Sequence, residues 1–550
     1  MFRTQPGTPG EKGRHAVKQR ILTAGILFTW LLMLAAGRIL WITADHTAKA
    51  SAAQGTISLS LPRERGTIFD RNGLPLTNQN TISLAALTAT PSVATELYRT
   101  LDKNTAQQAL ERLKTGKPIL LEVPDDFSAE GSLTVRHAEQ YSDSPIAVHL
   151  IGYLDSEGKG VCGIQAAYET LLCREGPSRI RFASNARGSA LLGVDPTLDA
   201  PEISSQGSVT LTLNREIQAV VERAVAGLLD TGAVLVLDAS TSDILASVSL
   251  PVYSPENVGA ALSAEGSPLL NRVFSAYNTG SVFKLCVAAA ALEAGIDPLE
   301  RYTCTGQINC RGQTFHCHKA DGHGPLTMSE ALSQSCNTYF IQLAAKVGAQ
   351  NIFDMARSLG MGQPTALCDG MVSSAGVLPE LDELLAVPAA LANFSLGQGS
   401  LLTTPVQIAL MTGAIANDGL FTPARLIQRT TGIDGQPSDN ASGEPLRVMS
   451  AKTAAALRSM MIGVIESGTG GAAQPLTGGA GGKTATAQTG LLSKDGNRVT
   501  QAWFTGFFPA ESPRFVVTVL AEGGASGSRS AAPVFAAVAN AIATLPSSSQ

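Results

Sequence analysis

Charged residues are scarce in this chain, and neither sign dominates. Asp, Glu, Lys and Arg make up 15% of the 550 residues, and the formal net charge is −5. Without a basic excess the chain lacks the footprint of a nucleic-acid-binding protein, and no zinc-finger or dinucleotide fingerprint occurs. Because 44% of the residues are hydrophobic, wholesale disorder is also excluded. A chain of this length exceeds one hydrophobic core, so we expect two or three domains.

Long hydrophobic runs are equally rare, and a single segment stands out. The run Ile21–Gly37 has no charge, and Arg20 and Arg38 bracket it. A spanning helix needs about 17–25 apolar residues. If Arg38 snorkels to the headgroups, the hydrophobic length extends to Ile42. We therefore predict a transmembrane helix over residues 21–42.

The flanking residues predict the orientation of this helix. The preceding stretch has one acid, Glu11, against five bases: Arg3, Lys12, Arg14, Lys18 and Arg20. By the positive-inside rule, residues 1–20 are cytoplasmic and the rest of the chain lies outside the plasma membrane. The alternative is a cleaved signal peptide, because Ala48-Lys49-Ala50 and Ala50-Ser51-Ala52 resemble cleavage sites. The apolar run exceeds the usual signal core of about 7–15 residues, which favours an uncleaved anchor.

Tight pairs of metal-ligating cysteines are absent from the sequence. All eight cysteines lie beyond the hydrophobic run, at positions 162, 173, 286, 304, 310, 317, 336 and 368. Outside the membrane, disulfides are permitted. A zinc site is conceivable where three cysteines and three histidines gather, at Cys304, Cys310, Cys317, His316, His318 and His323. No C-x2-C spacing is present, however, so the pattern favours a disulfide or free thiols over a metal site.

What the chain does contain, from about residue 209, is a regular pattern of strands and helices. The predicted strands are 209–213, 232–238, 244–249, 482–488, 502–508 and 514–521, and the predicted helices are 217–229, 283–294, 328–347, 405–417 and 532–545. This order indicates one sheet assembled from distant segments. The earlier part is less regular. It contains a predicted strand over 55–60, a surface hairpin over Arg65–Gly73 and a helix over Leu101–Leu113.

Three short motifs occur in order along the chain. They are Ser281-Val282-Phe283-Lys284, Ser335-Cys336-Asn337 and Lys483-Thr484-Ala485-Thr486. Each is weak alone, since Ser281 could cap a helix, Asn337 could lie in a turn and Lys483 could be solvated. A second Lys-Thr-Ala begins at Lys452, within a helix-patterned run. The copy at Lys483 follows a glycine-rich stretch and enters a strand, so it is the candidate.

The first motif has the chemistry of an activated nucleophile. Thr279-Gly280 predicts a turn that places Ser281 near the positive end of a helix. Lys284 follows one turn later on the same face. A lysine partly removed from water loses its proton more readily and can accept the serine proton. None of the seven histidines falls in or beside the three motifs, so no histidine triad is expected.

The other two motifs would bind substrate and move protons. Ser335 would relay protons, and the Asn337 amide would hold the substrate backbone. Lys483 and the threonine hydroxyls would lie along a strand edge and bind a carboxylate. Backbone N–H groups of Ser281 and Thr486 would form an oxyanion hole. The predicted catalytic residues are Ser281, Lys284, Ser335, Asn337 and Lys483, and the predicted substrate-binding residues are Thr484, Ala485 and Thr486.

Through these ordered motifs, the chain resembles the class B penicillin-binding proteins. Further matching segments are Arg65–Gly73, His149–Tyr153, Gly160–Gln165, Asn271-Arg272, Cys317 with His323-Gly324, Gly397–Gly399, Gly468–Gly470 and Trp503–Phe507. The resemblance implies an α/β (α+β) fold in which the transmembrane helix precedes a mixed, dimerisation-like pedestal over 43–205. A penicillin-binding transpeptidase domain, similar to β-lactamases, would follow over 206–547, with a central antiparallel sheet, flanking helices and a helical subdomain.

The resemblance also implies an activity. A D,D-transpeptidase of this kind would cleave the D-Ala-D-Ala bond of a peptidoglycan stem peptide, form an acyl-enzyme on Ser281, and pass it to an amino group of a neighbouring strand. β-Lactams would acylate the same serine. No metal or organic cofactor and no nucleic acid is implied. Because no glycosyltransferase domain precedes the pedestal, the expected partners are a separate glycosyltransferase and other membrane proteins of cell-wall synthesis.

Two residues depart from the family pattern. Ala485 replaces the usual glycine of Lys-Thr-Gly, and Thr279 replaces a usual proline. A methyl group beside the substrate groove could crowd the acyl donor, so we expect altered β-lactam affinity more than lost activity. Two alternatives stay open: a catalytically weak penicillin-binding sensor or scaffold, and a D,D-carboxypeptidase or β-lactamase that uses water as acceptor. Roles in division, elongation or sporulation are equally compatible with these motifs.

Overall fold

Two compact units make up the chain. The computed structural model describes residues 20–41, 55–173, 178–185, 188–191, 194–199, 206–492 and 496–546. The first unit contains residues 1–62, 82–137 and 177–202, and the second contains residues 63–81, 138–176 and 203–550. Parts of the predicted pedestal thus pack with the second unit, and the predicted domain limits stay predictions. Residues 1–19 of the predicted cytoplasmic tail and both candidate cleavage sites lie outside the described residues.

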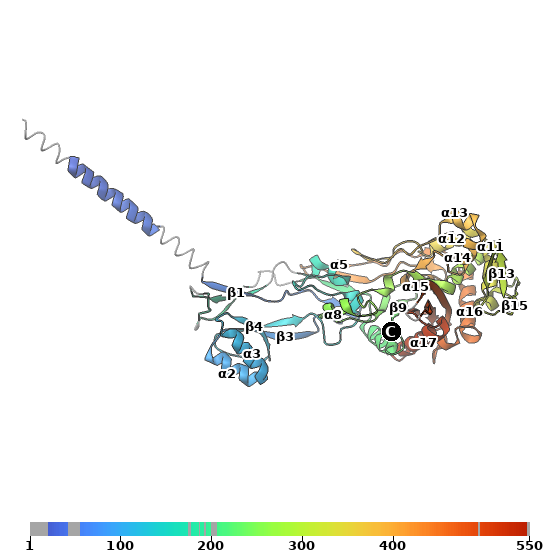
Figure 1. The fold of residues 1–550 in the computed structure, drawn as a ribbon, viewed down its shortest axis with the longest axis horizontal. Coiled ribbons are helices and arrows are strands. Elements are labelled where there is room, and N and C mark those ends of the chain that lie inside the picture. The colour runs from blue at the N-terminus through green and yellow to red at the C-terminus, as the bar shows by residue number, and fades with distance from the viewer. Residues whose placement is uncertain are drawn as a thin grey trace, which may run out of the picture. The chain divides into compact units, whose positions relative to one another are not determined.

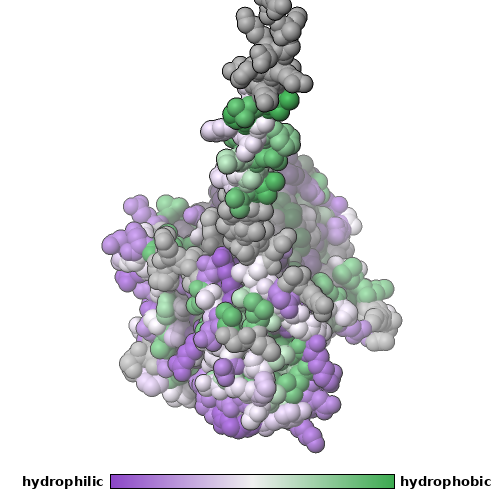
Figure 2. Space-filling view, turned by 90° about the vertical axis from the view of Figure 1, so that its left-hand side faces the viewer, coloured by the Kyte–Doolittle hydropathy of each residue, from purple (hydrophilic) through white to green (hydrophobic). Residues whose placement is uncertain are grey.

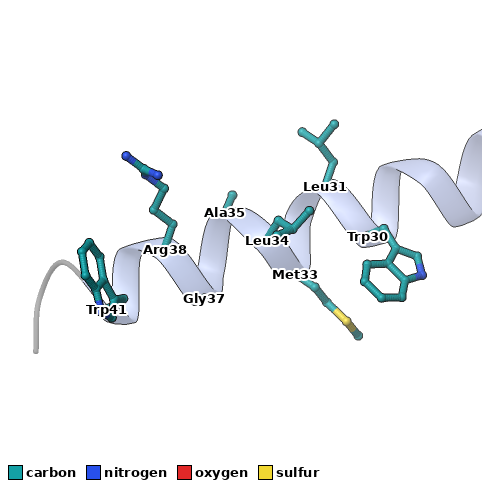
Figure 3. A pocket seen from close by; sticks show the side chains of 8 residues that line it. All are labelled: Trp30, Leu31, Met33, Leu34, Ala35, Gly37, Arg38 and Trp41. Carbon is teal, nitrogen blue, oxygen red and sulfur yellow. The ribbon is translucent and has the colours of Figure 1, made fainter.

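The first described element is a helix of 22 residues, Arg20–Trp41, close to the predicted span. It is the one helix among the described residues that is long and apolar enough to cross a membrane. All its residues are exposed, and Figure 2 shows hydrophobic side chains along it. The hollow in Figure 3 lies between side chains of this single helix, with Arg38 and Trp41 near its end. Such an exposed apolar surface is typical of a membrane-embedded segment.

The other described residues of the first unit form two small sheets and two helices. The sheets have the orders β1 (Thr56–Ser60), β6 (Arg179–Ala183), β7 (Thr197–Asp199) and β4 (Ile119–Val123), β3 (Asn80–Leu87), β5 (Leu133–Glu139). The Thr90 hydroxyl caps α2 (Pro91–Thr100), and the Asp102 carboxylate caps α3 (Lys103–Leu113). Their apolar faces pack with β3 in one cluster. The strand predicted over 55–60 and the helix predicted over 101–113 are confirmed, whereas α2 has no predicted counterpart.

The segment Arg65–Gly73 does form a hairpin, since the Asp70 N–H donates to the Leu74 carbonyl at 2.8 Å and the Asn72-Gly73 turn is exposed, but the expected surface position is wrong for Arg65 and Asp70, which are buried in the second unit. The Arg65 side chain is 1% exposed and its guanidinium lies 2.8 Å from the Glu169 carboxylate. The fully buried Asp70 accepts a hydrogen bond from the Arg215 N–H at 3.0 Å. The charged side chains suggested a solvent-exposed segment. Both charged groups are instead paired inside the protein, with partners 100 and 145 residues away along the chain.

An antiparallel sheet forms the centre of the second unit, with the strand order β10-β9-β25-β24-β23 in the described residues. Its strands are β9 (Gly232–Asp238), β10 (Ile244–Leu250), β23 (Gly481–Leu492), β24 (Arg498–Phe508) and β25 (Phe515–Glu522). In register, Val236 of β9 lies opposite Val517 of β25. The prediction of one sheet built from distant segments is therefore confirmed for five of the six predicted strands, whereas the strand predicted over 209–213 is β8 (Ser208–Leu211) and belongs to another sheet. The third motif lies on β23, at the edge of this sheet.

Helices cover both faces of the sheet. On one face, α7 (Arg215–Val225) and α17 (Ala532–Ala543) share an apolar cluster with the strands. On the other face, α15 (Pro405–Ala416) is buried along its whole length and contacts β9, β24 and β25 (Figure 1). This arrangement confirms the predicted fold class of a central sheet with flanking helices.

The long helix predicted over 328–347 is interrupted, so that prediction is wrong. The structure has α10 (Met328–Ser333) and α11 (Asn337–Val347) with a turn between them. Ser335 in this turn has a φ of +52°, a left-handed conformation that few side chains adopt. The Cys336 N–H donates to the Ala331 carbonyl at 2.8 Å, which closes the end of α10. Because the side chains of the turn are compatible with a helix, periodicity alone did not reveal the break.

The remaining elements surround this core. The turn η2 (Gly280–Phe283) leads directly into the buried helix α9 (Lys284–Glu293). Other helices are α4 (Val148–Ile151), α5 (Gly163–Ala167), α6 (Glu169–Leu172), α8 (Val258–Ser263), α12 (Ala349–Ser358), α13 (Leu381–Ala386), α14 (Pro388–Ser395) and α16 (Ala451–Ser467). Lys452 lies exposed on α16, as predicted for the second Lys-Thr-Ala.

Short strands complete the second unit. One further sheet has the order β2 (Ile68–Phe69), β8 (Ser208–Leu211), β20 (Ile427–Thr431) and β21 (Pro437–Asp439). The two-stranded ribbons near the helical block are β11 (Tyr277–Asn278) with β18 (Leu402–Thr403), β12 (Tyr302–Cys304) with β15 (Gly324–Leu326), and β13 (Gln307–Cys310) with β14 (Gln313–His316).

Candidate active site

Ser281 lies in η2, the turn that leads into α9, and is half-buried. Gly280 before it has a φ of +66°, and its N–H donates to the Gly397 carbonyl at 2.7 Å. A Cβ atom on Gly280 would lie 3.1 Å from the Ala487 Cβ, and one on Gly397 would lie 2.0 Å from the Gly280 oxygen. Both close approaches and both positive φ angles require glycine. The backbone of Gly397 and the strand β23 thus position the turn that presents Ser281.

Thr279, which stands where the family usually has proline, is fixed by its side chain. It is fully buried, and its hydroxyl is hydrogen-bonded to the Thr403 hydroxyl at 2.8 Å. The Trp503 indole N–H donates to the Asn278 carbonyl at 2.9 Å. These two hydrogen bonds fix the backbone before Ser281 and compensate for the absence of the rigid proline. Thr403 belongs to no motif, so the sequence does not indicate that its hydroxyl holds Thr279 in place.

Lys284 is the point at which the first two motifs meet. Its side chain is fully buried, and its Nζ donates at 2.8 Å both to the Ser335 carbonyl and to the Asn337 Oδ1. The Ser335 Oγ lies 3.4 Å from the same nitrogen. Burial lowers the pKa of Lys284 from its ordinary 10.5 to about 8, and the Cys336 and Cys317 thiols oppose this shift. A minor fraction of the lysine, far larger than for an ordinary lysine, is therefore neutral near physiological pH.

Lys483 joins the third motif to this centre. It is fully buried on β23, so the alternative of a solvated lysine is wrong. Its Nζ donates to the Thr484 carbonyl at 2.9 Å. Burial, and then the charge of Lys284, lower its pKa well below the ordinary value. Because Ala485 and Ala487 of the same strand pack against Gly280, β23 lies beside the Ser281 turn, and the three motifs converge on one centre.

The two threonines of the third motif have different environments. Thr484 is 5% exposed, and its hydroxyl is hydrogen-bonded to the Thr469 hydroxyl at 2.7 Å. Thr486 is exposed, and its hydroxyl accepts the Gly527 N–H at 3.1 Å. Thr486 can thus donate its own hydroxyl proton to a ligand, whereas Thr484 is committed to a protein partner. Their roles in substrate binding stay predictions.

Ala485 packs beneath the Ser281 turn. It is 3% exposed and belongs to the main hydrophobic cluster. Its Cβ lies 3.3 Å from the position that a Cβ on Gly280 would occupy. Side chains alternate along a strand, so the Ala485 methyl points to the same face as Lys483 and Ala487 and away from Thr486. The methyl group therefore packs against the turn that presents Ser281, on the face of β23 that also carries Lys483, and its effect on β-lactam affinity stays a prediction.

A group of metal-ligating side chains lies next to the second motif. All eight cysteines are in described residues, and no disulfide joins any of them in the structure. The ligand atoms of Cys304, Cys317, His323 and Cys336 all lie within 4.8 Å of one another. Cys336 is the central residue of Ser335-Cys336-Asn337. The zinc site considered from the sequence included Cys304, Cys317 and His323. It did not include Cys336, which lies on another segment of the chain.

Comparison with known proteins identifies the family. Residues 232–540 match the penicillin-binding protein transpeptidase domain. The chain is 28% identical to the penicillin-binding protein PbpB of Mycobacterium tuberculosis, over 93% of this chain and 83% of that protein. It is 27% identical to the peptidoglycan D,D-transpeptidase MrdA of Acinetobacter baumannii, over 96% of this chain and 88% of that protein.

A solved structure shows the same relationship. The structure of penicillin-binding protein 3 from Mycobacterium tuberculosis in complex with aztreonam matches with a TM-score of 0.64 and 27% identity, over 88% of this chain and 96% of that one. A buried Ser-x-x-Lys turn at the edge of an antiparallel sheet thus occurs here in the fold of penicillin-binding transpeptidases. The chain belongs to this family, and its relatives place it among the class B penicillin-binding proteins.

Proposed function

We propose that the chain cross-links peptidoglycan stem peptides through an acyl-enzyme on Ser281, with Lys284 as the general base. The observation that carries this proposal is the environment of the Lys284 amine. A neutral amine has two N–H donors and one lone pair. Both donors are used by the Ser335 carbonyl and the Asn337 Oδ1, each at 2.8 Å. The lone pair can then accept the hydroxyl proton of Ser281, one helical turn earlier, while the Ser335 Oγ lies 3.4 Å from the same nitrogen.

The chemistry follows from this arrangement. Lys284 takes the Ser281 proton as Oγ bonds to the carbonyl carbon of the penultimate D-alanine. The developing oxyanion accepts hydrogen bonds from the N–H groups of Ser281 and Thr486. As the C–N bond breaks, the leaving D-alanine amine takes the proton from Lys284, with Ser335 as relay. The acceptor amine then gives a proton to Lys284 and attacks the ester, and Ser281 recovers its proton when the new amide forms.

In the second motif Asn337 positions Lys284, and substrate binding is assigned to the third motif. Asn337 donates its amide to the His316 carbonyl at 3.1 Å, which holds its oxygen towards Lys284 and its backbone at the start of α11. Lys483 and the exposed hydroxyl of Thr486 would bind the terminal carboxylate of the stem peptide or of a β-lactam. The same β-lactam chemistry opens the lactam C–N bond and leaves the acyl group on Ser281.

The location of this activity rests on the N-terminal helix. With basic residues before Arg20–Trp41, the positive-inside rule places the catalytic unit outside the plasma membrane. Nascent glycan strands would then come from a separate glycosyltransferase in the same membrane. A structure of a peptidoglycan synthase complex contains a chain that matches 96% of this one, with a TM-score of 0.67 and 25% identity, which supports a partner of this kind.

Fluorescent-penicillin labelling of membranes tests the proposed nucleophile. We expect the intact protein to be labelled once per chain and Ser281→Ala to show no labelling. The two Lys-Thr-Ala copies offer a matched control: Lys483→Ala should lower the labelling rate by more than about tenfold, whereas Lys452→Ala should label normally. A folded intact protein without labelling, or a labelled Ser281→Ala variant, would refute the assignment. Transfer of a D-Ala-D-Ala stem peptide to an amine, rather than to water, would separate a transpeptidase from a carboxypeptidase.

A further inference from the structure

Four side chains converge beside the second motif from three separate segments. Cys304 ends β12, Cys317 follows β14, His323 precedes β15, and Cys336 lies in the turn between α10 and α11. The three thiols are buried and the imidazole is half-buried. Among the described residues, this group is the one in which at least three such ligand atoms gather so closely.

Two of the six distances among these atoms match those around a tetrahedral ion, and the other four are no longer than 4.8 Å. With Zn–S near 2.3 Å and Zn–N near 2.0–2.1 Å, tetrahedral geometry requires about 3.8 Å between two sulfurs and about 3.6 Å between sulfur and nitrogen. The Cys317 Sγ lies 3.9 Å from the Cys336 Sγ and 3.5 Å from the His323 Nδ1. A disulfide would need a separation near 2.05 Å and would use only two of the four groups.

The backbone around the ligands is shaped for this convergence. A Cβ on Gly322 would lie 2.2 Å from the Cys304 carbonyl, so the loop before His323 can approach β12 only because this residue is glycine. The Cys317 N–H donates to the Gly306 carbonyl at 2.8 Å, which holds the second ligand over the same strand pair. The chain thus brings its ligands together through backbone contacts that exist before any ion binds.

We propose that Cys304, Cys317, His323 and Cys336 bind one structural zinc ion. Three thiolates and one imidazole in tetrahedral positions favour zinc over hard cations such as magnesium or calcium. With all four positions supplied by the protein, none is left for water, so the ion does not itself activate a nucleophile. This site goes beyond the transpeptidase activity proposed above and lies outside its reacting atoms.

The ion has a consequence for the neighbouring motif. Cys336 lies between Ser335 and Asn337, both of which bind Lys284. The Asn337 amide also donates to the carbonyl of His316, the residue before Cys317. An ion that ties Cys336 to Cys317 therefore fixes the left-handed Ser335 turn and, through it, the position of the Lys284 amine. This effect on acylation rests on the function proposed above, whereas binding of the ion does not.

Metal content of the purified full-length protein tests the site directly. The protein is extracted in detergent without chelator, and its metal content is measured by inductively coupled plasma mass spectrometry. We expect about one zinc ion per chain. Cys304→Ser and Cys336→Ser should lose it, while His323→Cys, which keeps a tetrahedral thiolate set, should retain it. Cys310→Ser is the matched control, because this thiol lies on the adjacent β13–β14 ribbon but outside the cluster.

The outcomes separate the site from the enzyme activity. Ser281→Ala should keep its zinc although it loses penicillin labelling. Removal of the ion from the intact protein should slow labelling by about 10–100-fold and lower Tm, and zinc but not magnesium should restore both. A folded, penicillin-labelled protein that contains no zinc and takes up none would overturn the proposal. Equal loss of zinc from Cys310→Ser, or a Cys317–Cys336 disulfide in the native protein, would overturn it as well.

Discussion

The pH dependence of acylation tests whether Lys284 is the base. Its pKa is lowered from 10.5 to about 8 by burial. At pH 7 an amine with this pKa is about 9% neutral, whereas an ordinary lysine is about 0.03% neutral, so burial supplies roughly 300 times more base. If only neutral Lys284 accepts the Ser281 proton, the second-order rate of acylation should rise by about tenfold between pH 7 and pH 9, with a midpoint near 8.

The assay is stopped-flow or time-resolved labelling with a fluorescent penicillin, with Tm measured at each pH. The titratable groups that face Lys284 are Lys483 on β23 and the Cys317 and Cys336 thiols. Because the pKa of Lys483 lies well below its ordinary value, Lys483→Ala should lower the rate but leave the midpoint near 8. Lys284→Arg should label at least 10²-fold more slowly (roughly the general-base contribution), since guanidinium does not deprotonate.

A flat rate between pH 7 and pH 9 in folded protein would refute the argument. So would a Lys284→Arg variant that labels at the rate of the intact protein, because the side chain would then act only through its charge. A midpoint that moves by more than one pH unit in Lys483→Ala would mean that the observed titration belongs to Lys483 or to the coupled pair.

Three further substitutions follow from packing, each read out by chemical denaturation together with penicillin labelling. Ala485→Gly should cost about 1 kcal/mol of unfolding free energy, because a buried methyl is lost and strand flexibility rises, while labelling changes less than threefold; a large gain in labelling would show that the methyl does crowd the groove. Thr279→Val should cost about 1–3 kcal/mol because the buried Thr403 hydroxyl loses its partner, and Thr279→Val combined with Thr403→Val should cost less than the sum. Arg65→Ala should cost about 3 kcal/mol or more because it leaves buried partners of the guanidinium unpaired; a cost below 1 kcal/mol would show that this residue is not a structural anchor.

Local sequence pattern determined much of this protein. The continuous apolar runs 232–238 and 244–249 became two strands buried on both faces, because no other element buries such short runs so completely. The charge-free run after Arg20 became one exposed helix. The ordered set of Ser281, Ser335 and Lys483 predicted the candidate site, because each residue type has a specific chemical use in such a set.

Tertiary structure alone decided the rest. The Ser335 turn divides a helix that periodicity treats as continuous, since its left-handed φ depends on contacts and not on residue type. Ala485 packs into the core because Gly280 leaves space for its methyl group, which cannot be read from the motif. Cys336 joins Cys304, Cys317 and His323 although 19 residues separate it from Cys317. The sequence pattern predicts which face of a helix or strand is apolar. Which side chains from distant segments come into contact depends instead on how these elements pack.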